Sequence, residues 1–95
     1  MKEFKIIRNK AAKRNEIIPE GREFGKRLKE ILKDRHMTQK RLCEITHFSD
    51  TMMCRWINGY AIMRLNTFAV LTDALGLTAM EIAYLLEAFW EDEDG

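Results

Sequence analysis

The chain has 95 residues, enough for one small domain in which every helix must contribute an apolar face to the core. Its composition, 46% hydrophobic and 33% charged with one proline, excludes an intrinsically disordered chain and is typical of a helix-rich globule. No apolar run approaches the length of a membrane span, and residues 1–4 begin no signal peptide, so we expect a cytoplasmic protein.

Charge is unevenly distributed along the chain, although the net charge is only +1. Residues 1–41 contain 14 Lys and Arg against 6 Asp and Glu, whereas residues 42–95 contain 2 against 9. This asymmetry indicates a surface for nucleic acid or another polyanion in the first half of the chain. The alternative is that the lysines only solvate the first helix and an N-terminal arm.

The N-terminal segment, residues 1–20, combines basic residues with Phe4, Ile7 and Ala11 at near-helical spacing. This spacing predicts a helix over residues 3–15. The segment is expected to act as a basic arm on a phosphate backbone or in a minor groove. The alternatives are a disordered tail and an extra helix packed on the domain.

The domain proper is expected over residues 21–90. A helix is predicted to begin at Glu20 or Arg22, after Pro19, and to run to about Asp34. Its apolar residues recur at i, i+4, i+7 and i+8 and so form one buried stripe. The stripe consists of Phe24, Leu28, Ile31 and Leu32.

Residues 38–58 predict two short helices joined by a tight turn. Thr38 can cap the first helix and Ser49 the second, and each helix has its apolar residues on one side. Only residues 46–48 separate the two helices. This arrangement is typical of a helix-turn-helix, whose second helix enters a DNA major groove.

These residues also resemble a known family. The resemblance to the phage-repressor (Cro/repressor-like, XRE) helix-turn-helix family covers residues 22–86, including a fourth helix over residues 65–76. It rests on Thr38, Gln39, Leu42, Phe48, Ser49, Met53, Arg55, Trp56, Asn58 and Gly59. The chain departs from the family pattern at Cys43, His47 and Met63, where alanine, glycine and proline are usual.

The resemblance implies an all-α fold, a five-helix lambda-repressor-like DNA-binding domain with or without an extra N-terminal helix or arm. At position 47 the backbone tends to need a positive φ, which histidine tolerates better than most residues. Cys43 lies where the two helices cross, so it is expected to be a small packing residue.

The outward face of the recognition helix, residues 49–57, provides the candidate base contacts Asp50, Thr51 and Arg55. Arg55 can donate two hydrogen bonds to guanine, and Thr51 can bond a base or contact a thymine methyl. Asp50 matches a family position that often touches a base. Phosphates repel its carboxylate, so two other roles stay open for Asp50. It can interact favourably with the positive N-terminal end of its own helix, or it can form an ion pair with Arg55 or Arg41.

The candidate phosphate contacts lie at the edges of the same motif. Gln39 and Lys40 lie in the first turn of a helix, where backbone amides favour anions. Ser49, at the start of the recognition helix, is a further candidate for a phosphate contact. The resemblance implies that Asn58 and the loop after it also contact phosphates, and Arg64 is the basic residue of that loop.

The last helix is predicted to start at Thr78, which forms a capping box with Glu81, and to continue through Trp90. Its apolar surface exceeds what one face of a small domain can bury. Tyr84, Phe89 and Trp90 are therefore expected on a dimer or partner surface, unless residues 1–18 cover them. Residues 91–95 are expected to form a solvated acidic tail.

No catalytic, metal or cofactor site is expected. The two cysteines and two histidines match no common zinc spacing, and no phosphate loop or nucleophile elbow is present. Disulfide bonding is not expected in a cytoplasmic chain.

The sequence predicts a non-enzymatic transcriptional regulator, a repressor, that binds an inverted-repeat operator in double-stranded DNA as a homodimer. Two alternatives stay open: an antitoxin-like regulator that also binds a small protein partner, and a helix-turn-helix fold used only for protein interaction.

Overall fold

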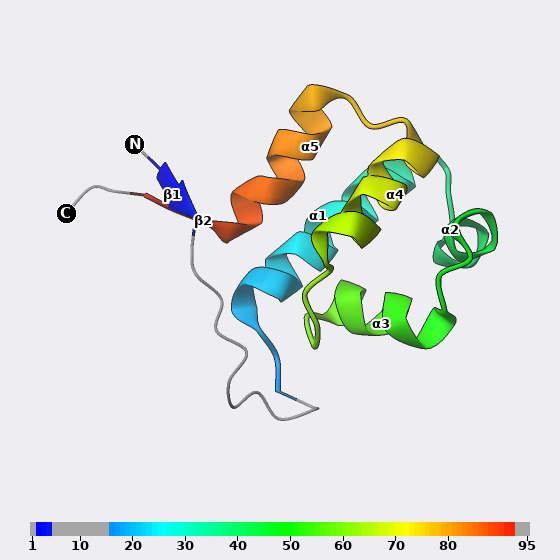
Figure 1. The fold of residues 1–95 in the computed structure, drawn as a ribbon, viewed down its shortest axis with the longest axis horizontal. Coiled ribbons are helices and arrows are strands. Elements are labelled where there is room, and N and C mark those ends of the chain that lie inside the picture. The colour runs from blue at the N-terminus through cyan, green and yellow to red at the C-terminus, as the bar shows by residue number, and fades with distance from the viewer. Residues whose placement is uncertain (1, 5–15, 93–95) are drawn as a thin grey trace.

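The computed structural model describes the backbone of residues 2–4 and 16–92 and the side chains of residues 16–90. Five helices and a 3₁₀ turn form the body of the protein, and two short strands lie beside them (Figure 1). The helices are α1 (Pro19–Asp34), α2 (Gln39–Thr46), α3 (Asp50–Asn58), α4 (Leu65–Leu75) and α5 (Ala79–Leu86). The turn is η1 (Glu87–Phe89), and the strands are β1 (Lys2–Phe4) and β2 (Trp90–Asp92). The five-helix, all-α prediction is confirmed.

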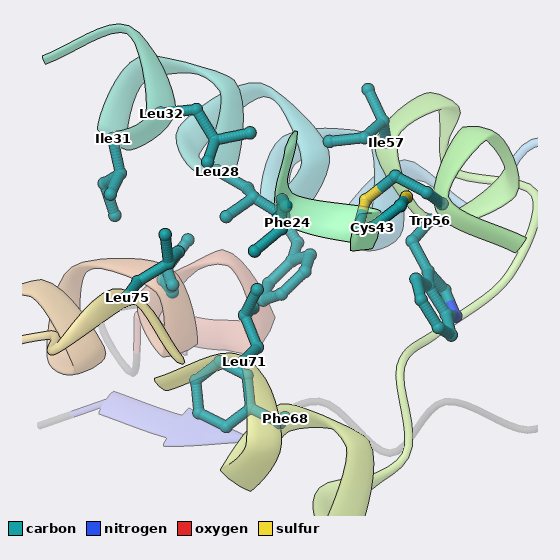
Figure 2. Close-up of a cluster of buried hydrophobic side chains, with 13 residues drawn as sticks. Phe24, Leu28, Ile31, Leu32, Cys43, Trp56, Ile57, Phe68, Leu71 and Leu75 are labelled. Carbon is teal, nitrogen blue, oxygen red and sulfur yellow. The ribbon is translucent and has the colours of Figure 1, made fainter. Parts of the chain in front are cut away.

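The hydrophobic core draws on all five helices (Figure 2). Each helix contributes one of the largest fully buried side chains. In chain order these are Leu28, Leu42, Met53, Leu71 and Leu85. The predicted stripe on α1 is buried along its whole length. A core this small therefore has no helix that is dispensable for its packing.

The first helix begins earlier than predicted, at Pro19 rather than at Glu20 or Arg22. Proline suits the first position of a helix because its fixed φ is helical and its missing N–H would have no partner there. Ile18 N donates to Gly59 O at 2.8 Å, which ties the start of α1 to the end of α3.

α1 and α3 cross with almost no space between their backbones. A Cβ added at Gly25 would lie 1.9 Å from Ile57 O and 2.5 Å from Ile57 C. Gly59, with φ +85°, closes the same contact against the backbone of Arg22. Only glycine at position 25 allows α3 this position against α1.

Arg35 joins three helix ends on the other side of the core. Its Nε donates to Leu75 O at 3.2 Å, at the end of α4, and its guanidinium binds both carboxylate oxygens of Glu81 on α5. Glu81 also accepts from Thr78 N, and Thr78 Oγ1 accepts from Glu81 N, which confirms the predicted capping box. The corner between α4 and α5 therefore depends on one charged pair.

Acid is expected to weaken this corner. Hydrogen bonds from Arg35 and from the Thr78 backbone lower the pKa of Glu81 from 4.5 to about 2. Because the folded-state pKa is the lower one, the stabilisation is complete above about pH 4.5 and is lost as the pH falls toward 2. Urea midpoints at pH 7 and pH 3 should differ more for the wild type than for Glu81→Gln. Glu44→Gln, which alters an exposed pair with Arg41, should keep the wild-type difference.

Two predictions about the chain ends are wrong. The last helix does not continue through Trp90: α5 ends at Leu86, η1 follows, and Trp90 is extended with φ −96° and ψ 142°. The acidic residues 91 and 92 would oppose the negative C-terminal end of a helix, whereas a strand lets their backbone pair with another segment.

That other segment is β1, which pairs antiparallel with β2 so that Phe4 lies opposite Trp90. Residues 3 and 4 are thus in a strand and not in the predicted helix, while positions 5–15 of that helix lie outside the described residues. The first two residues of the predicted acidic tail belong to β2.

No helix of the described residues has the length and apolar character needed to cross a membrane.

Candidate nucleic-acid interface

Two side-chain caps define the helix-turn-helix as predicted. Thr38 Oγ1 accepts from Arg41 N at 3.0 Å, and Ser49 Oγ accepts from Met52 N at 3.0 Å. Each bond satisfies one N–H that the first turn of a helix leaves without an intrahelical partner. The starts of α2 and α3 are therefore fixed by local chemistry.

The turn between the helices is held from both sides. His47 has φ 64° and is left-handed, as expected at this position. Thr46 Oγ1 donates to Leu42 O at 2.7 Å and accepts from Phe48 N at 3.3 Å. The ring of Phe48 meets that of Trp56 edge-on, with centroids 5.3 Å apart, which anchors the turn on α3.

Glycine at position 47 is expected to stabilise the protein. The left-handed conformation strains a residue with a Cβ, and this gain exceeds the extra entropy of glycine in the unfolded chain. His47→Gly should therefore raise the free energy of unfolding by about 0.5–1 kcal/mol in urea titrations. Glu44→Gly, in the right-handed interior of α2, should lower it by about 1 kcal/mol. A loss of stability in His47→Gly would contradict the strain argument.

The two sides of α3 differ sharply. Met53, Trp56 and Ile57 are 1%, 7% and 6% exposed and face the core. The outward face consists of Asp50, Thr51, Met52, Cys54 and Arg55, of which only Arg55 is half-buried. The helix thus presents a row of polar and soft side chains on a rigid support.

Arg55 also contacts its own chain. Its Nη2 donates to Tyr60 O at 3.3 Å, and Tyr60 N donates to Arg55 O at 2.8 Å. The guanidinium of Arg55 therefore helps to hold the loop that follows α3. The sequence did not indicate that Arg55 links the recognition helix to the loop after it.

Asp50 lies against Cys43 of α2. Burial and a hydrogen bond to the Asp50 carboxylate raise the pKa of the Cys43 thiol above its usual value. The thiol is therefore neutral at physiological pH and acts as a donor across the helix crossing. Arg41, which was one possible ion-pair partner for Asp50, instead has its Nη1 3.5 Å from Glu44 Oε1.

The predicted phosphate contacts frame the outward face. Lys40 is exposed and Gln39 half-buried in the first turn of α2, where no acidic residue competes with an anion. Asn58 and Arg64 are exposed at the two ends of the loop between α3 and α4. Arg64 occupies the N-cap position of α4 without a side-chain cap bond, so its guanidinium does not serve that helix end.

Residues 27–86 match the family model of the Cro/C1-type HTH DNA-binding domain. The chain belongs to this family. The Cro/C1-type match starts within α1, ends with the last residue of α5, and excludes η1 and both strands. Comparisons with curated proteins and with solved structures gave no significant match.

The three residues predicted on the dimer or partner surface have different environments in this Cro/C1-type chain. Phe89 packs within the chain, its ring centroid 5.7 Å from that of Phe24. Tyr84 is 37% exposed; its ring lies 4.6 Å from the Arg27 guanidinium, and its hydroxyl donates to Glu30. Trp90 is 36% exposed.

Metal-binding residues do not gather in the part of the chain that the structure describes: no group of three or more His, Cys, Asp or Glu could hold an ion there. Cys43 is buried and Cys54 is exposed, and both are free thiols.

Proposed function

We propose that this Cro/C1-type protein is a transcriptional regulator, a repressor, that binds double-stranded DNA sequence-specifically. The observation that carries the proposal is the two-sided α3: its inner face is locked into the core, and its outward face, which is largely exposed, carries the polar groups of Asp50, Thr51 and Arg55. A helix of this kind fits a major groove, where base edges differ in their donors and acceptors.

Base recognition is assigned to the outward face. Thr51 contacts a base through its hydroxyl or its methyl group, and Arg55 donates to a guanine through its guanidinium. Asp50 is the third candidate, and its carboxylate accepts from a cytosine amino group, a contact that competes with the bond from Cys43.

The residues around this face are assigned the role of positioning the protein on the duplex. Gln39, Lys40 and Ser49 contact phosphates at the starts of α2 and α3, and Asn58 and Arg64 do so from the following loop. The protein acts as a homodimer with Tyr84 and Trp90 as candidate interface residues, on two half-sites roughly 34 Å apart.

The test is selection of bound fragments from a random DNA pool by the wild type and by Thr51→Val. This substitution keeps the shape of an exposed side chain and removes its hydroxyl. We expect the wild type to enrich an inverted repeat and the variant to change preference at one position in each half-site. Failure of the wild type to enrich any motif would contradict the proposal.

A second candidate, a helix-turn-helix used for protein interaction, is favoured by one observation. Met52 is 36% exposed in the middle of the outward face, which gives this face an apolar centre. Co-purification of a small protein partner, lost in Met52→Glu but kept in Thr51→Val, would support this candidate or the antitoxin-like one.

A further inference from the structure

A separate row of positive charge runs along α1 beside its contact with α3. Arg22, Lys26, Lys29 and Lys33 are all exposed and recur at i, i+4, i+7 and i+11, so they lie on one side of the helix. Gly25, which contacts the backbone of α3, lies toward this side. The row extends roughly 16 Å along the helix axis at 1.5 Å per residue.

An open groove of about 1120 Å³ runs beside this row. Besides the four cations, its lining includes Asn58 at the end of α3 and Tyr60 in the following loop. Asn58 is the last residue of α3, and Tyr60 is linked to the outward face of that helix, since Arg55 on that face bonds the carbonyl of Tyr60. The groove is thus continuous with the candidate nucleic-acid interface.

The two acidic residues of α1 that line the groove form their contacts away from the row. Glu23 and Glu30 also line the groove, but Glu23 binds Arg27 Nε at 2.8 Å and Glu30 accepts from the Tyr84 hydroxyl. Arg27 in turn donates to Tyr84 O at 2.6 Å, so these acidic groups are engaged on the side of α5. Among the described residues, the four cations form no ion pair with an acid.

We propose that this groove binds the phosphate backbone of the duplex next to the segment read by α3. The inference rests on the proposed function, and it extends the contact beyond the helix-turn-helix to α1. One DNA strand carries a charge about every 3.4 Å of axis, so a row of 16 Å has the length of roughly five nucleotides. Such contacts add affinity without base preference and make binding depend on salt.

The test compares two double variants that lower the net charge equally. Lys26→Gln/Lys29→Gln removes two charges from the groove. Val70→Glu/Met80→Glu, at exposed positions of α4 and α5, adds two negative charges elsewhere. Dissociation constants are measured between 50 and 300 mM salt on the selected operator with long flanks and with flanks trimmed to the core, after thermal melting shows that both variants are folded.

The groove variant should reduce the slope of log K against log salt by about 1–2 relative to the control variant, because each lost phosphate contact removes about 0.9. Trimming the flanks should weaken binding by the wild type and the control variant more than binding by the groove variant, which keeps only Arg22 and Lys33 of the four cations. Equal slopes for the two variants would overturn the proposal and leave the groove to another acidic ligand, such as a protein segment.

The same slopes measured on random duplex separate this inference from the proposed function. If the wild type selects no operator, the regulator proposal fails, yet a reduced slope in the groove variant still supports backbone contact. If the wild type selects an operator and the slopes are equal, only the groove proposal fails.

Discussion

Replacing Gly25 with alanine is expected to lower the free energy of unfolding by about 3 kcal/mol or more, the upper range for overpacking. The added Cβ would lie 1.9 Å from Ile57 O, and backbone atoms cannot move aside as a flexible side chain can. The gain of about 1 kcal/mol in helix propensity offsets only part of this cost. In a domain of this size the melting temperature should fall by more than about 10 °C, measured by circular dichroism.

Gly21 offers a matched control on the same helix. A Cβ there would meet Ile62 Cδ1 at 2.9 Å, the mobile end of a side chain, and Gly59 Cα at 3.4 Å. Gly21→Ala should therefore melt within a few degrees of the wild type. Equal melting temperatures for the two alanine variants would show that α3 can move away from α1 at little cost.

Arg55→Ala is expected to weaken binding to the selected operator by about 1–3 kcal/mol, or roughly 5- to 150-fold, and to relax preference at one base pair of each half-site. The physical reason is the loss of a guanidinium that can bond a guanine edge. Titration of labelled operator and of variants at each position measures both effects. Since Arg55 also bonds Tyr60 O, thermal melting is needed to separate binding from folding.

Arg64→Ala serves as the control for a backbone contact. It should weaken binding about equally on all sequences and reduce the salt slope by about 1. If Arg55→Ala gave the same uniform loss, Arg55 would have to be reassigned from base contact to a role in positioning the loop.

Features encoded within a few residues could be predicted from the sequence. The caps at Thr38, Ser49 and Thr78 and the left-handed His47 are local, because a side chain bonds or strains its own turn. The stripe on α1 follows from helical periodicity alone. These features were sufficient to predict where α2, α3 and α5 begin, the buried side of α1, and which side of α3 faces outward.

Features that join distant segments could not be predicted in this way. The contact of Gly25 with Ile57, the clamp of Arg35 on Glu81, and the bond between Cys43 and Asp50 each require two helices to be in place. The helical prediction for Trp90 failed for the same reason, since its partner strand lies at the opposite end of the chain. Local propensity carries no information on such pairs.

The pairing of β1 with β2 divides the molecule into two units of unequal stability. Each strand has three residues, so their pairing contributes little stability. The two strands lie near opposite ends of the chain, so bringing them together costs much loop-closure entropy. Both strands lie outside the family match. The β1–β2 pair can therefore open while the five helices stay folded. We expect the amide hydrogens of this pair to exchange with solvent well before those of α1 and α4.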